Sequence, residues 1–130
     1  MKKIFQLRPL SPHLTIHRKI QTAILSIMHR ISGIGLFIGS ILVVIWLFFL
    51  ALSESYFAIA TYFFGTTFGK FILLIWSFVI LFHLTNGVRY LVWSIGYGLD
   101  LKSVYRSGYL VIVLSFLFTL FLWLRALSIL

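Results

Sequence analysis

A histidine within an apolar segment is the residue of this sequence that most directly suggests chemistry. His83 follows the apolar run 71–81, which with its continuation is long enough to cross a bilayer. An ionisable side chain at that depth is costly to keep, so it marks a candidate functional site by default. Gly87 lies one helical turn later on the same face, leaving bare backbone beside the imidazole. Because neutral imidazole ligates iron, this pair suits a flat ligand such as haem.

A purely structural role is the alternative for the same two residues. A histidine inside a membrane can hydrogen-bond to a neighbouring helix, and a glycine can let two helices approach closely. His83 and Gly87 alone therefore leave both interpretations open.

A second polar group lies near the start of the first apolar segment. Ser26, His29, Arg30 and Gly33 are spaced i, i+3, i+4 and i+7, which places them on one stripe of a helix. A guanidinium cannot be neutralised by deprotonation in a protein, so Arg30 needs an acceptor or water where it lies. The stripe is therefore a second candidate site.

The chain has only two acids that could pair with Arg30, namely Glu54 and Asp100. We expect Glu54 on the opposite side of the membrane and Asp100 in a loop. A bound anion would supply the missing charge, and haem propionates are carboxylates that arginine binds by charge-assisted hydrogen bonds. His29 could then donate to the second propionate, and the Ser26 hydroxyl could bond a carbonyl such as that of a quinone. In the alternative, Arg30 reaches lipid phosphates at the interface.

The composition predicts an all-α membrane protein. Of the 130 residues, 62% are hydrophobic and only 10% are charged. The net charge of +9 then indicates contact with anionic lipid head groups rather than with nucleic acid. There is no cysteine, which excludes thiolate-bound iron–sulfur clusters and thioether-linked haem on this chain. Any haem must be held non-covalently.

Two regions are expected along the chain. Residues 1–20 form a basic N-terminal arm, in which Pro9 and Pro12 argue against a regular helix. Residues 21–130 form a three-helix transmembrane domain, with spans at about 22–52, 70–93 and 108–130. Residues 56–64, in the first connection, are expected to form a short interfacial helix. No span has enough soluble sequence around it for a separate catalytic domain, so we expect the chain to catalyse nothing alone.

The basic residues predict the orientation of the three spans. Nine of the eleven lysines and arginines fall on the side of the N-terminus and the second loop, and two fall on the other side. The nine are Lys2, Lys3, Arg8, Arg18, Lys19, Arg30, Arg89, Lys102 and Arg106, and the two are Lys70 and Arg125. Because basic residues are retained inside, we expect the N-terminus in the cytoplasm or the mitochondrial matrix.

Three motifs in this order resemble a known family. They are Arg8-Pro9-Leu10-Ser11-Pro12-His13-Leu14, Ser26-Ile27-Met28-His29-Arg30-Ile31-Ser32-Gly33, and His83-Leu84-Thr85-Asn86-Gly87-Val88-Arg89 with Trp93 and Gly96. They resemble the cytochrome b556 subunit of succinate dehydrogenase, a membrane anchor of respiratory complex II. The likeness covers the N-terminal arm and the first two spans, whereas the third span matches only in being a helix.

The resemblance implies a four-subunit complex in the mitochondrial inner membrane or the bacterial plasma membrane. A flavoprotein oxidises succinate, an iron–sulfur subunit carries the electrons, and two membrane anchors bind haem b and reduce ubiquinone. It further implies that His83 is an axial haem ligand, with the second ligand coming from the other anchor. By the same resemblance, Ser26 and Arg30 form the quinone site, and His29 and Arg30 contact the haem propionates.

The sequence also departs from the family pattern. The family commonly has histidine at the position of Tyr90 and aspartate at the position of Ser94, and tyrosine is usual at the position of His17. Tyr90 can still hydrogen-bond to a propionate but carries no positive charge. Without an acid at position 94, Arg89 loses a candidate partner. These departures concern the surroundings of the haem rather than His83, Ser26 or Arg30.

Other functions remain as alternatives. An anchor of a fumarate reductase would work in the reverse direction with another quinone. A transporter or channel would need a polar path across the whole membrane, whereas the outer halves of the three spans are apolar. A structural subunit without cofactor would explain the spans but not His83, Gly87 and the stripe from Ser26 to Gly33.

Overall fold

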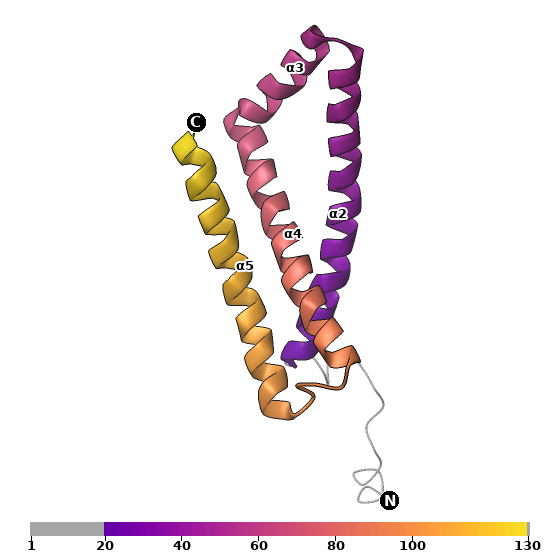
Figure 1. The fold of residues 1–130 in the computed structure, drawn as a ribbon, viewed down its shortest axis with the longest axis vertical. Helices are drawn as coiled ribbons and strands as arrows, with labels where there is room; N and C mark the ends of the chain where they lie inside the picture. Colours follow the sequence, from indigo (N-terminus) through magenta and orange to yellow (C-terminus); the bar gives the residue numbers. More distant parts are fainter. Residues whose placement is uncertain (1–19, 130) are drawn as a thin grey trace, which may run out of the picture.

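The structure, a computed structural model, describes residues 20–129, and these form four helices. They are α2 (Gln21–Leu52), α3 (Glu54–Gly65), α4 (Thr67–Ser94) and α5 (Leu101–Ile129) (Figure 1). The helices α2, α4 and α5 are each long and apolar enough to cross a membrane. The predicted all-α fold with three spans is therefore confirmed. The predicted N-terminal arm falls almost wholly outside the described residues.

The long helix α4 occupies the centre of the arrangement, because it packs against α2 on one side and α5 on the other. Figure 1 shows α2 and α4 converging near the beginning of α2 and separating towards their other ends, which α3 connects. The predicted short helix after the first span is thus present, as residues 54–65 rather than 56–64. The convergence brings the first turns of α2 beside the last turns of α4.

Two helices begin earlier than their hydropathy predicts, at residue 67 instead of about 70 and at residue 101 instead of about 108. In each case a polar side chain caps the helix. The Thr66 hydroxyl accepts from the Gly69 amide at 3.1 Å, and the Asp100 carboxylate accepts from the Ser103 amide at 3.0 Å. A cap supplies an acceptor to an otherwise unpaired backbone N–H, so the helix starts at the cap rather than where apolar residues begin.

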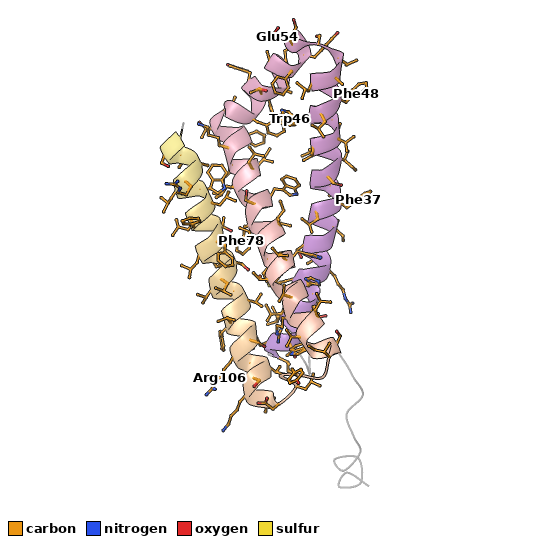
Figure 2. All side chains as sticks on the ribbon, viewed as in Figure 1. Phe37, Trp46, Phe48, Glu54, Phe78 and Arg106 are labelled. Carbon is orange, nitrogen blue, oxygen red and sulfur yellow. The ribbon has the colours of Figure 1, made fainter. Side chains whose placement is uncertain are left out.

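The interior of the helix arrangement is unusually polar. Among the described residues, the buried apolar side chains are Leu25, Phe82 and Val111, whereas the buried polar ones are Ser32, Asn86, Arg89, Ser115 and Thr119. Large apolar side chains cover the outside instead (Figure 2). This distribution suits a lipid environment, in which small and polar residues mediate helix–helix contacts.

Arg89 joins α4 to α5 from a buried position. Its side chain is 5% exposed. Its Nε donates to Ser107 Oγ and one terminal nitrogen donates to the Val104 carbonyl, both at 3.0 Å, while the other terminal nitrogen lies 3.4 Å from Asn86 Oδ1. The guanidinium carbon also lies 4.0 Å from the centre of the Trp93 ring, a cation–π contact. The Arg89 guanidinium is therefore stabilised by neutral hydrogen-bond acceptors and an aromatic ring rather than by a carboxylate.

The corner between α3 and α4 depends on a glycine. A Cβ added at Gly69 would overlap the Phe63 carbonyl oxygen and lie 2.6 Å from Phe64 Cα, whereas a Cβ at Gly65 would meet nothing within 4 Å. We predict that Gly69→Ala lowers the free energy of unfolding by about 1–3 kcal/mol, because backbone must move to admit the methyl group. Gly65→Ala is the matched control and should be neutral or stabilising by up to about 1 kcal/mol. Reversible unfolding in mixed micelles measures both, and equal stabilities would contradict the prediction.

The start of α5 should depend on pH. Hydrogen bonds from the hydroxyl and the backbone amide of Ser103 lower the pKa of Asp100 below its ordinary value. The cap is therefore fully present above the ordinary carboxyl pKa and is lost as the pH falls through the lowered one. We expect the Ser103 amide chemical shift in micelles to titrate below about pH 3.9. In Asp100→Asn, which still caps but does not ionise, that titration should vanish.

Candidate functional site

Two histidines meet where α2 and α4 converge. The rings of His29 and His83 are stacked with their centres 3.9 Å apart and their planes 13° from parallel. The ring of Tyr90 lies 5.1 Å from that of His29, tilted by 59°. The two polar groups predicted from the sequence, one on each helix, are therefore in direct contact through these imidazoles.

Ser32 holds one edge of the His83 ring. Its hydroxyl oxygen lies 2.9 Å from His83 Nδ1 and 2.7 Å from the backbone carbonyl oxygen of His29. Ser32 is only 6% exposed, so both contacts are inside the helix pair. One hydroxyl thus links both histidines of the cluster.

Two glycines face the two histidines. A Cβ at Gly33 would lie 3.4 Å from His83 Cε1, and a Cβ at Gly87 would lie 4.0 Å from His29 Cε1. The sequence predicted bare backbone beside His83 from its own helix. In the structure the glycine that faces His83 is Gly33, on the opposite helix, while Gly87 faces His29.

One nitrogen of the cluster has an unmet hydrogen-bonding capacity. His29 Nδ1 is buried and has no hydrogen-bond partner within residues 20–129. Buried polar atoms in native proteins are almost always paired, so an orphaned one indicates that a partner is missing. A bound group or a neighbouring subunit could supply that partner.

The stripe from Ser26 to Gly33 does not face one neighbour as a unit. His29 and Gly33 face α4 and contact His83. Arg30 is exposed and makes no hydrogen bond or ion pair to any described residue, and Ser26 is partly buried. Arg30 is therefore available to groups outside this chain, whereas its sequence neighbour His29 is directed inward.

Reasoning from the sequence missed the role of Ser32. The buried residues of α2 are Leu25, Ser32 and Gly39, spaced by seven. A seven-residue spacing marks the face of a helix that packs against a neighbour. In the structure this face carries Ser32 towards α4, while Arg30 is exposed. Asn86 was also missed, and it is fully buried beside Arg89.

The described residues contain no group of three or more histidine, aspartate or glutamate side chains that could hold a metal ion. What the cluster offers chemically is an imidazole ligand, an unpaired imidazole nitrogen and, on the outer side of α2, a guanidinium.

Comparison with known proteins gives a consistent result. The sequence model of a family described as succinate dehydrogenase/fumarate reductase transmembrane subunit matches residues 6–122. A protein of Rickettsia prowazekii (strain Madrid E), named succinate dehydrogenase cytochrome b556 subunit, is 38% identical over 122 residues, which cover 94% of this chain and 95% of the relative.

Two further relatives carry the name succinate dehydrogenase cytochrome b560 subunit. That of Reclinomonas americana is 38% identical over 126 residues, covering 89% of this chain and 84% of the relative. That of Marchantia polymorpha is 43% identical over 108 residues, covering 78% of this chain and 77% of the relative. The chain belongs to the succinate dehydrogenase/fumarate reductase transmembrane subunit family.

Proposed function

We propose that this chain is the haem b-binding membrane anchor of a succinate dehydrogenase, and that it helps to pass electrons from an iron–sulfur subunit to ubiquinone. The observation that carries the proposal is the cluster of His29, His83 and Ser32 between α2 and α4. The relatives named cytochrome b556 and b560 support it, because a cytochrome b contains haem.

The residues of the cluster fit a haem. A haem brings four nitrogen ligands for its iron, so His83 suffices as the axial ligand from this chain. Within the described residues, His83 Nε2 has no hydrogen-bond partner and can serve as the ligating atom. The orphaned His29 Nδ1 suits a propionate oxygen, to which it would donate. When bound, the haem would accept and release single electrons.

Arg30 and Ser26 are proposed to bind the quinone, and Arg30 also contacts a haem propionate together with His29. Both lie on α2 close to the histidine cluster, one turn apart. The exposed guanidinium can reach a ligand held between this chain and its partners. A hydrogen bond from each side chain to a quinone oxygen would stabilise the negative charge that develops there as electrons arrive.

The remaining parts of the complex follow from the incomplete site. We propose that a second small membrane anchor supplies the other axial ligand, and that a flavoprotein and an iron–sulfur subunit dock on the side where Arg106 lies (Figure 2). The division of the basic residues predicted from the sequence, nine on one side of the membrane and two on the other, supports an orientation with the N-terminus in the cytoplasm or matrix. The family description also includes fumarate reductases, so the reverse reaction is the second candidate.

Replacing the proposed iron ligand should abolish or shift the haem signal. We predict that His83→Ala removes or shifts the b-type band in the reduced-minus-oxidised absorption spectrum of the purified complex, because the proposed bond between the iron and this imidazole is lost. Leu84→Ala is the matched control, since Leu84 is the next residue on α4 and is 58% exposed. An unchanged band in His83→Ala would show that another residue ligates the iron. No band in the wild-type complex would contradict haem binding altogether.

Replacing the proposed quinone residues should affect only the last step of the reaction. We predict that Arg30→Gln or Ser26→Ala lowers kcat/KM for ubiquinone by about 10- to 100-fold, equivalent to about 1.4–2.7 kcal/mol. Succinate oxidation with a soluble dye, which takes electrons before the membrane site, should stay unchanged. Arg106→Gln, at an exposed arginine on the same end of the molecule, serves as the control (Figure 2). Equal ubiquinone kinetics in Arg30→Gln and Arg106→Gln would refute the assignment.

A further inference from the structure

We infer that Ser32 is a positioning residue that holds His83 in the tautomer protonated at Nδ1 and so leaves the Nε2 lone pair for iron. The inference rests on the haem-binding function proposed above and adds a residue to it. It begins from the two contacts of a single hydroxyl, to the His29 carbonyl and to His83 Nδ1.

Counting protons on these atoms decides the direction of each hydrogen bond. A carbonyl oxygen can only accept, so the 2.7 Å contact requires that Ser32 donate its one proton to the His29 carbonyl. The Ser32 oxygen can then only accept from His83 at 2.9 Å, and Nδ1 must carry the proton. The two lengths agree, because O–H···O bonds centre near 2.7–2.8 Å and N–H···O bonds near 2.9–3.0 Å.

The same helix contains a comparison for the first of these bonds. Ser40 donates to the carbonyl three residues earlier at 2.7 Å, as Ser32 does, and has no histidine beside it. Ser94 and Ser128 also donate to the carbonyl three residues earlier, at 2.7 and 2.8 Å. This local bond recurs among the serines of these helices, which favours donation by Ser32 to the His29 carbonyl.

The opposite tautomer is disfavoured by the surroundings of the ring. If Nδ1 were unprotonated, its lone pair would face the lone pairs of Ser32 Oγ inside the helix pair, where the 6% exposure of Ser32 leaves little access for water. Rotation of the ring away from Ser32 is hindered as well. His29 covers one face of the ring at 3.9 Å.

A neutral imidazole with its proton on Nδ1 has an unprotonated Nε2, which is the state that a metal ligand requires. Hydrogen bonding of the Nδ1 proton also fixes the ring orientation and makes the ligand more basic. Without the Ser32 hydroxyl, we expect about tenfold weaker haem retention, the lower end of the usual range for such partners. We also expect a higher midpoint potential, because a less basic ligand stabilises ferric iron less.

The test compares side chains of matched shape in the purified four-subunit complex. Ser32→Thr keeps the hydroxyl, Ser32→Val has the same shape without it, and Ser32→Ala removes it. Ser40→Ala is the control for losing a serine that bonds only to its own helix. Haem content after dialysis against apomyoglobin and the midpoint potential of the b-type band are measured for each. We expect Ser32→Thr and Ser40→Ala to match wild type, and Ser32→Val and Ser32→Ala to lose haem and shift upward in potential.

Two outcomes would overturn the inference while leaving haem binding intact. One is wild-type haem retention and potential in Ser32→Ala or Ser32→Val, in a complex whose haem is still lost in His83→Ala. The other needs no variant to fold: in the haem-free wild-type chain in lipid, ¹⁵N-labelled histidine should show His83 protonated at Nδ1. Protonation at Nε2 would contradict the inference. A wild-type complex without haem would instead refute the proposed function.

Discussion

A bilayer interior offers no water to hydrogen-bond polar groups, and this constraint governs the arrangement of α2, α4 and α5. Backbone groups satisfy it within each helix, whereas polar side chains must find partners on their own or a neighbouring helix. Accordingly, the hydroxyls of Ser32, Thr85 and Ser115 lie between helices, each within hydrogen-bonding distance of a carbonyl of its own helix and of a side chain of the next. Polar contacts therefore fix which faces meet, while the apolar surface makes contact with lipid.

The central helix meets this constraint in two different ways on its two faces. Towards α5 it carries Arg89, whose charge is spread over the Ser107 hydroxyl, the Val104 carbonyl and the Trp93 ring. Desolvation of such a buried cation offsets much of what its contacts contribute to stability. Towards α2 it carries His83, which is neutral when it ligates a metal and can be held by one hydroxyl. On the proposed function, the face towards α2 carries the haem ligand.

The sequence predicted the spans well because an apolar run of this length is typical of a membrane-crossing helix, but it placed the starts of α4 and α5 too late. Capping hydrogen bonds to Thr66 and Asp100 set those starts. A hydropathy profile does not detect such bonds, because it measures only how apolar the residues are. The same limitation applied to the site. Spacing placed His29 and Arg30 on one stripe, yet only the packing of α2 on α4 decides that His29 points inward and Arg30 outward. Ser32 was missed because its role lies in a contact with a residue 51 positions away.

On the proposed function, the part of the haem site that this chain contributes is ordered without its partner subunits. His83 contacts a stacked ring and a hydroxyl, both from α2, so the entropy of ordering the proposed ligand would be lost during folding rather than during haem binding. Haem binding would therefore stabilise the same α2–α4 contact that positions its ligand, since a ligand that binds only the folded state stabilises that state. His29 Nδ1 is the exception, because its partner is not among the described residues. On the proposed function, that nitrogen is satisfied only in the assembled complex, so haem and the second anchor would each favour the binding of the other through the same pair of helices.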